Sequence, residues 1–342
     1  MKRLILGALL LTLLCAGGVA GWFYYSLERP YQAYQGEQFV EIAPGSGTAR
    51  MGRALAEAGI VRSATEFRAA VWRRGAGRRL QAGEYRFDSP MTPLQVVDKI
   101  ARGDVYLRPI TFREGLSIRQ MAQIFEERGF GPAAEFVAAA AKPDRIRGID
   151  PQATDLEGYL FPDTYTLPRR TTADQLVARM VARFEAALTP QLRERAAARG
   201  LSVRELVTLA SLVEKETGKG EERPLVAAVY ANRLKIGMGL QCDPTVIYAL
   251  ERAGRYDGNI TREDLRFDSP YNTYRYAGLP PGPIAAPGEA SMQAAASPAE
   301  VPYIYFVSRN DGSHAFATTL DEHNRNVHQY QVLYFRERRQ SR

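Results

Sequence analysis

An apolar stretch at the N-terminus constrains this chain more than any other feature of its sequence. Residues 4–25 carry no charged side chain and are mostly apolar or small, and Lys2 and Arg3 precede them. At about 1.5 Å per residue, a helix of this length reaches about 33 Å, which is enough to cross a bilayer core of about 30 Å. The stretch therefore predicts a single-pass anchor in the inner (cytoplasmic) membrane. The basic flank predicts that residues 1–3 are cytoplasmic and that residues 26–342 lie outside the cytoplasm.

A cleaved signal peptide is the alternative interpretation of this stretch. Gly18, Val19 and Ala20 offer small residues at a cleavage site. However, the apolar region is longer than that of a usual signal peptide, and Trp22 and residues 23–25 resemble the aromatic belt of a membrane interface. We therefore favour an uncleaved anchor.

The composition of the whole chain is typical of a protein that folds in water. Of 342 residues, 45% are hydrophobic and 24% are charged, which argues against a disordered or polytopic membrane protein; the length predicts about two domains. The net charge of +7 favours anionic partners. Because the sequence has no basic run and no basic helix with interleaved aromatics, we predict no nucleic-acid partner. Its two cysteines build neither a disulfide framework nor a zinc ribbon.

An internal repeat organises the residues after a short connector. Shifting the sequence by 70 residues aligns a predicted strand at 39–42 with one at 109–112, and each is followed by a glycine turn and a helix. Ser117 and Gln120 have the spacing of a capping box at the start of the second helix. Such strand–helix units suit a binding module, and a spacer that merely packs is the alternative.

The strongest local signal is a helix in the C-terminal part. Ser202 and Glu205 have capping-box spacing at its start, and Gly218 and Gly220 predict its end. Between them the chain reads as a continuous helix whose last turn carries several charged residues. Two of these charged residues are carboxylates, and helical geometry predicts the directions in which they project.

Glu214 and Glu216 are these two carboxylates. At about 100° per residue they project about 200° apart, so this helix cannot aim both at one scissile bond. Glu216 lies on the side of Leu209 and Leu212. Burial there and the negative end of the helix dipole both raise a carboxyl pKa, as a general acid requires near neutral pH. A solvated helix end is the alternative.

Several ordered motifs of the C-terminal part resemble one family. They are VEKET (213–217), ANRL (231–234), LQCDPTVIY (240–248), YNTY (271–274), GLPPGPI (278–284) and a late YFV…H.F…EHN pattern. Together with the anchor and the repeat, they resemble the endolytic murein transglycosylase family, also called YceG-like or MltG. The family's catalytic glutamate is the second carboxylate of its EKET motif, and this position corresponds to Glu216.

The resemblance implies an activity and a set of partners. The activity is cleavage of MurNAc–GlcNAc β-1,4 bonds within peptidoglycan glycan strands, with formation of 1,6-anhydroMurNAc ends, which would limit the length of nascent strands. The implied partners are the glycan strands, the cytoplasmic membrane and peptidoglycan synthases, and no cofactor is implied. A non-catalytic peptidoglycan-binding scaffold and a water-using muramidase are the alternative functions.

The resemblance also implies an α+β fold with a LysM-like region and a C-terminal α+β catalytic domain. The predicted organisation is a cytoplasmic tail (1–3), a transmembrane anchor (4–25), a connector (26–38), a LysM-like peptidoglycan-binding region with the repeat (39–142), a linker (143–154) and the catalytic domain (155–342).

Four residues of the motifs are candidates for binding the substrate. They are Gln241, Asp243, Tyr271 and Asn272, although turn and core roles are common for such residues. We predict no metal site, because the histidines at 314, 323 and 328 match no common ligand spacing.

Overall fold

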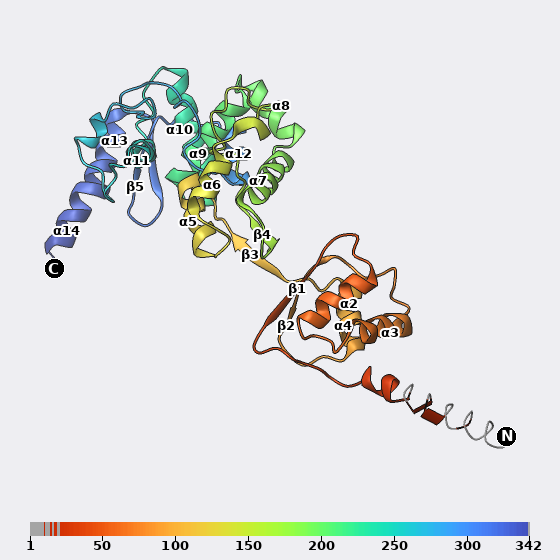
Figure 1. The fold of residues 1–342 in the computed structure, drawn as a ribbon. Coiled ribbons are helices and arrows are strands. Elements are labelled where there is room, and N and C mark those ends of the chain that lie inside the picture. Colours follow the sequence, from red (N-terminus) through yellow and green to blue (C-terminus); the bar gives the residue numbers. More distant parts are fainter. Residues whose placement is uncertain (1–9, 11–13, 16, 19–20, 341–342) are drawn as a thin grey trace, which may run out of the picture. The chain divides into compact units, whose positions relative to one another are not determined.

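The computed structural model describes residues 10, 14–15, 17–18 and 21–340, which form two compact units. The N-terminal unit extends to Pro109 and also includes Thr166–Arg170, and the C-terminal unit contains Ile110–Tyr165 and the chain from Thr171 onward. The chain passes between the units within two paired strands, β3 (Leu107–Thr111) and β4 (Thr164–Pro168). Figure 1 traces the elements of each unit.

The N-terminal unit consists of a two-stranded antiparallel sheet and three helices. Its elements are β1 (Gln38–Ile42), α2 (Thr48–Glu57), α3 (Ala64–Arg74), β2 (Gly83–Phe87) and α4 (Pro93–Arg102). In the sheet, Val40 pairs with Tyr85. Both side chains are buried in one hydrophobic core with Leu55 and Ile100 from the helices, so burial of one sheet face holds this unit together.

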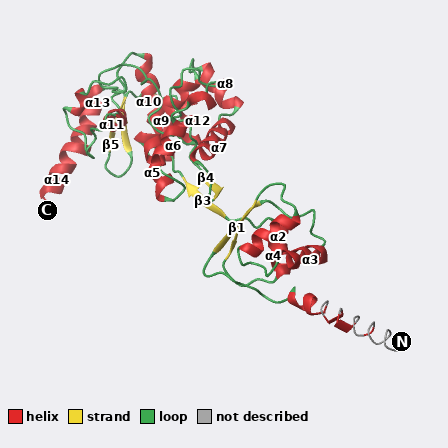
Figure 2. Cartoon of the chain, in the orientation of Figure 1, coloured by secondary structure: helices red, strands yellow, loops and turns green. Residues whose placement is uncertain are grey.

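The C-terminal unit is mainly helical, and its strands are short (Figure 2). Besides its parts of β3 and β4, its elements are α5 (Ile118–Glu127), α6 (Ala133–Ala140), α7 (Ala173–Ala187), α8 (Pro190–Ala198), α9 (Val203–Glu216), α10 (Arg223–Lys235), α11 (Asp243–Arg252), α12 (Glu289–Ala296), β5 (Tyr305–Ser308), β6 (His314–Ala317), α13 (Leu320–Val327) and α14 (Tyr334–Gln340). Helices and strands together agree with the predicted α+β class.

The two copies of the repeat have the same order of elements. β1, α2, α3 and β2 form the first copy, and β3, α5, α6 and β4 form the second. The glycine between strand and helix is left-handed in both, with φ of 75° at Gly45 and 76° at Gly115, a conformation that other residues adopt only at a steric cost. Ser117 and Gln120 form the predicted capping box. The second copy therefore closes with a strand that lies beyond the predicted repeat region.

The division between the units differs from the linker predicted at 143–154. Phe136 of α6 is fully buried and contacts Phe112 and Phe125, and α6 packs on α7. Asp150, inside the predicted linker, is itself buried. The polar, turn-prone composition of this segment reflects a packed loop, and the second copy of the repeat belongs mainly to the C-terminal unit.

The predicted helix α9 forms the centre of the C-terminal unit. Residues 206–213 are all buried, and the helix packs against α10, α11 and α12. Ser202 and Glu205 form its capping box, as predicted. The helix ends shortly before Gly218, close to the predicted position, but the chain leaves it at Thr217 in an extended conformation with φ of −134°. The Thr217 hydroxyl accepts the Lys219 N–H at 3.1 Å, which ends the helix without a left-handed glycine.

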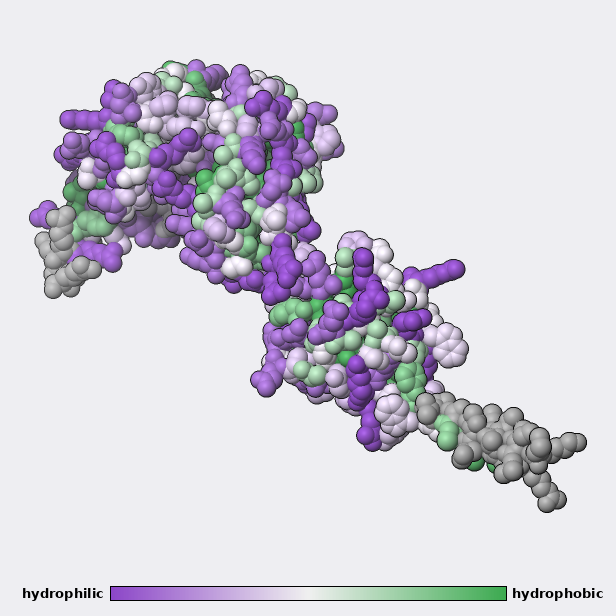
Figure 3. Space-filling view, in the orientation of Figure 1, coloured by the Kyte–Doolittle hydropathy of each residue, from purple (hydrophilic) through white to green (hydrophobic). Residues whose placement is uncertain are grey.

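The surface of the described residues is mostly polar. Hydrophilic residues predominate on the face that Figure 3 shows, with small hydrophobic areas between them, as is usual for surfaces in contact with water. Within the described part of the chain, no helix combines the length and the apolar character needed to cross a bilayer. Most of the anchor predicted at 4–25 lies outside the described residues.

Candidate active site

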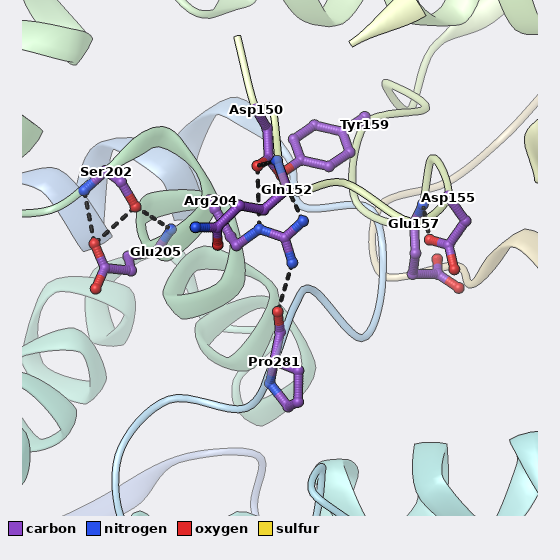
Figure 4. Close-up of polar contacts among 9 residues, drawn as sticks. All are labelled: Asp150, Gln152, Asp155, Glu157, Tyr159, Ser202, Arg204, Glu205 and Pro281. Carbon is purple, nitrogen blue, oxygen red and sulfur yellow. Dashed lines mark hydrogen bonds and ion pairs between the residues drawn. The ribbon is translucent and has the colours of Figure 1, made fainter. Parts of the chain in front are cut away.

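The N-terminal end of α9 is fixed by an ion pair that its sequence did not predict. The Arg204 guanidinium lies between Asp150 and the carbonyl of Pro281, as Figure 4 shows. Its Nη2 is 3.0 Å from Asp150 Oδ2, and its Nη1 donates to the Pro281 oxygen at 2.6 Å. Tyr159 donates its hydroxyl to the same carboxylate at 2.5 Å. These contacts tie the start of α9 to the loops that contain Asp150 and Pro281.

Glu216 lies at that other end, and its carboxylate accepts hydrogen bonds from two elements that follow in the chain. Tyr230 of α10 donates its hydroxyl to Glu216 Oε2 at 2.9 Å. The Cys242 thiol, at the residue that precedes α11, donates to the same oxygen at 3.6 Å. Both donors are buried, whereas Glu216 is partly exposed. The protein therefore holds the carboxylate in place, and the residue keeps part of its surface in contact with solvent.

The surroundings of Glu216 raise its pKa. Burial is the largest cause, and the nearby Asp243 carboxylate acts in the same direction, because each disfavours the charged form. The hydrogen bonds from Tyr230 and Cys242 and the charge interaction with His314 act in the opposite direction and lower the pKa. The net effect keeps the proton on this carboxyl to a higher pH than on an ordinary glutamate, as a general acid requires.

Glu222 and His314 form a second polar cluster beside this carboxyl. The ring nitrogen Nδ1 of His314 lies 2.7 Å from Glu222 Oε2, and the backbone N–H of His314 donates to Glu222 Oε1 at 2.9 Å. The Thr217 hydroxyl, one residue after Glu216, donates to Glu222 at 3.3 Å. Burial tends to raise the pKa of Glu222, but the hydrogen bonds from His314 outweigh it and lower that pKa. The cluster attaches β6 to the chain that follows the catalytic candidate.

Glu214 faces a different environment, as its helical position predicts. Its Oε1 accepts from Arg223 Nη2 at 3.2 Å, and its Oε2 accepts from the Gly288 N–H at 2.9 Å. The Glu214 side chain is only 6% exposed and that of Arg223 only 14%. Glu214 is thus one partner of a buried ion pair, and both of its oxygens are occupied.

Two of the four predicted substrate-binding residues lie near Glu216. Asp243 begins α11 directly after Cys242, is exposed, and accepts a 2.6 Å hydrogen bond from the Tyr274 hydroxyl. Gln241 is exposed on the other side of Cys242 and has φ of 49°. A non-glycine residue in this conformation is uncommon and is held by its surroundings, here by a hydrogen bond from its N–H to the Thr273 carbonyl.

The other two lie in different surroundings. The Tyr271 ring packs on Tyr248 with a centroid distance of 5.0 Å, and Arg252 lies over it. Asn272 is completely buried, and its amide donates to the carbonyls of Leu265 and Phe267 at 3.0 and 2.8 Å. No hydrogen bond joins either residue to Glu216 within the described part of the chain. Asn272 therefore shapes its loop, and none of its polar atoms is directed to solvent.

Replacing Asn272 with alanine is expected to lower the free energy of unfolding by about 2 kcal/mol, because the carbonyls of Leu265 and Phe267 lose the donor that this buried amide supplies. Urea unfolding measures this change, and Asn259→Ala, which alters an exposed asparagine, is the control. Unchanged stability with weakened glycan binding would instead indicate that Asn272 contacts the substrate.

Tyr230 and His314 are site residues that the sequence analysis did not identify. Tyr230 is fully buried on α10. A buried tyrosine hydroxyl usually has a hydrogen-bond partner, so the position of Tyr230 on its helix was the only feature that could have indicated a role. For His314 the sequence offered only its spacing from other histidines. Phe306 of β5 contacts both rings, with centroid distances of 6.0 Å to Tyr230 and 5.3 Å to His314. The β5–β6 hairpin thus supports the site.

Known proteins resemble this chain over most of its length. The model of the YceG-like family matches residues 40–329. The endolytic murein transglycosylase of Bacillus subtilis is 31% identical over 306 residues, which cover 85% of this chain and 84% of that protein. The enzyme of the same name from Streptococcus pneumoniae serotype 2 is 31% identical, and the match covers 93% of this chain and 63% of that protein.

A solved structure is also similar. The crystal structure of a yceG-like protein from Listeria monocytogenes superposes with a TM-score of 0.58 at 30% identity, covering 85% of this chain and 99% of that one. The fold therefore agrees with the family that the motifs indicate. From the family model and the identity to these relatives, the chain belongs to the YceG-like family.

Proposed function

We propose that this protein is an endolytic murein transglycosylase, which cleaves the MurNAc–GlcNAc β-1,4 bond inside peptidoglycan glycan strands. The observation that carries the proposal is Glu216, a partly exposed residue whose carboxyl pKa is raised by burial and whose position is set by Tyr230 and Cys242. The names of the relatives support this activity for the family.

One carboxyl group is sufficient for the reaction. Protonated Glu216 donates its proton to the glycosidic oxygen as the bond from that oxygen to C1 breaks. The resulting carboxylate then accepts the proton of the C6 hydroxyl while O6 bonds to C1, which closes the 1,6-anhydro ring and restores the acid. No water and no nucleophile from the protein take part. The products are an anhydroMurNAc end and a new GlcNAc end.

The donors around Glu216 serve both halves of this cycle. Burial favours the protonated acid that begins it, and the hydroxyl of Tyr230 and the thiol of Cys242 stabilise the carboxylate that forms midway. The charge interaction with His314, which Glu222 holds in place, acts in the same direction. The pKa of Glu216 is thereby raised, and its carboxyl group can still ionise during the cycle.

A water-using muramidase is the second candidate, and Asp243 is the observation that favours it. This exposed carboxylate is close enough to Glu216 to raise its pKa. Glycosidases that use water or a nucleophile employ two carboxyl groups, and Asp243 would supply the second.

Mass spectrometry of the products of the purified full chain tests the activity. Intact glycan strands should yield fragments that end in 1,6-anhydroMurNAc. Reducing ends would support the muramidase, and a lack of cleavage accompanied by binding would support a non-catalytic scaffold.

The N-terminal unit and the apolar stretch suit attachment at the cell wall. We assign peptidoglycan binding to the N-terminal unit, whose β1-α2-α3-β2 order fits a LysM-like module. We assign residues 4–25 to a single-pass anchor in the inner membrane, with the C-terminal unit outside the cytoplasm. In that position the enzyme would meet nascent strands next to the synthases that extend them, and cutting there would limit strand length.

N-terminal sequencing of the mature protein tests the anchor. An intact N-terminus is expected, together with digestion of the C-terminal unit by protease added to spheroplasts. A sequence that begins at Gly21 would mean that the stretch is a cleaved signal peptide.

A further inference from the structure

A pocket of about 200 Å³ lies in the C-terminal unit, away from the contacts of Glu216. The start of α5, the helix α6 and the second half of α11 provide its walls. Ile118, Val137 and Ala141 give it an apolar side, and Arg119 and Glu251 contribute charges of opposite sign. The pocket thus offers three kinds of contact within the volume of a small molecular group.

Hydrogen bonds hold the inner wall of this pocket in place. Glu157, which Figure 4 shows beside Asp155, accepts the Ile118 N–H at 3.0 Å and the Tyr248 hydroxyl at 3.2 Å. Arg252 donates to that hydroxyl at 3.2 Å. These contacts join the start of α5 to α11, so the pocket is built before any ligand arrives.

Arg119 and Glu251, in contrast, have no partner among the residues that the structure describes. Within the described part of the chain, neither side chain forms an ion pair or a hydrogen bond, although both border the pocket. A cation and a carboxylate that stay apart beside an apolar wall match a ligand that carries both charges and small apolar groups. A short peptide with ammonium, carboxylate and methyl groups has this chemistry, whereas the hydroxyl-rich face of a sugar has no charge.

The helix α11 connects this pocket to Glu216. Cys242, the residue before its first turn, contacts the catalytic candidate. Asp243, Ile247 and Glu251 follow at intervals of four residues, so they share one face of the helix, and each is at least partly exposed. Glu251 lies about 13 Å along the helix axis from Cys242. An extended peptide of three to five residues spans about 10 to 17 Å, which matches this separation.

We propose that the pocket binds the stem peptide that branches from the glycan strand, and that this contact favours cleavage of strands that carry stems. This inference rests on the proposed transglycosylase activity, which supplies the strand. Arg119 would pair with a carboxylate of the stem and Glu251 with its ammonium group, while its alanine methyl groups would lie against Ile118 and Val137.

The test compares two substrates for the full chain: strands that keep their stem peptides and the same strands stripped by an amidase. Wild-type protein is expected to cleave the first faster. Arg119→Gln and Glu251→Gln should each lower the ratio of the two rates about tenfold, because each removes one charge-assisted contact. Arg193→Gln, which removes an exposed charge on α8, should leave the ratio unchanged.

Equal wild-type rates on the two substrates would overturn the proposal, as would variants with an unchanged ratio. Weaker binding of a stem-free disaccharide by both variants would indicate a sugar subsite and would overturn it too. If wild-type protein cleaved neither substrate, the transglycosylase proposal would fail by itself. Calorimetric titration with a soluble stem pentapeptide would then decide: binding that both variants weaken supports the pocket, and absence of binding refutes it.

Discussion

Replacing Glu216 with glutamine is expected to lower kcat/KM for the formation of anhydro products by about 10² to 10⁴-fold, or about 3 to 5 kcal/mol in transition-state stabilisation. Glutamine keeps the size of the side chain and can still accept the Tyr230 hydrogen bond. It cannot deliver a proton to the leaving oxygen. Because glutamine resembles the protonated acid that burial favours, the melting temperature should stay the same or rise. Product analysis and thermal unfolding of the same preparation measure both effects.

Glu214→Gln is the matched control, two residues earlier on the same helix. It leaves Arg223 with a weaker set of partners, since the second carboxylate on that guanidinium, Glu114, is 3.5 Å away. We expect stability to fall by about 2 to 3 kcal/mol and folded protein to retain most of its activity. If the Glu214 variant were folded and inactive while the Glu216 variant remained active, the acid would be Glu214.

Stability is expected to fall as the pH is raised from 5 to 8, and Glu157 is the main cause. Burial raises the pKa of this carboxyl from 4.5 to about 8 in the folded chain. The folded state binds the Glu157 proton more tightly than the unfolded state does. The contribution of Glu157 to the free energy of unfolding is therefore complete below the pKa that this carboxyl has in the unfolded chain. This contribution is lost as the pH rises toward the pKa of Glu157 in the folded chain. Over this interval the loss is on the order of 3 kcal/mol.

Glu157→Gln tests this linkage, because glutamine resembles the protonated acid. Its amide can accept the Ile118 N–H and donate to the Tyr248 hydroxyl. The variant should match wild-type stability at pH 5 and exceed it at pH 8 in urea unfolding. Parallel pH profiles for the two proteins would mean that Glu157 stays ionised, with the Ile118 N–H and Arg252 compensating for its burial.

Much of the local structure follows from the sequence because its causes are local. Ser202 and Glu205 hydrogen-bond each other's backbone within one turn of α9, and Ser117 and Gln120 do the same for α5. Such contacts close over a few residues, so their spacing can be read directly from the chain. Helical geometry likewise separates Glu214 from Glu216 before any tertiary contact is known.

The boundary between the units was decided by tertiary packing. Residues 143–154 have the composition of a linker, yet Asp150 in this segment is buried and pairs with Arg204, which lies 54 residues later. Polar composition alone does not distinguish a solvated linker from a loop whose polar groups are satisfied inside the protein.

The sequence by itself determined the fold class, the helix that carries Glu216 and the face from which this carboxyl projects. Only the tertiary structure decided what surrounds it. Tyr230 comes from α10, Cys242 from the residue before α11, and the Glu222–His314 pair joins segments 92 residues apart. The physical reason is that a capping box or helix face depends on neighbours within a turn, whereas desolvation and donors at a carboxyl depend on which distant elements pack over it.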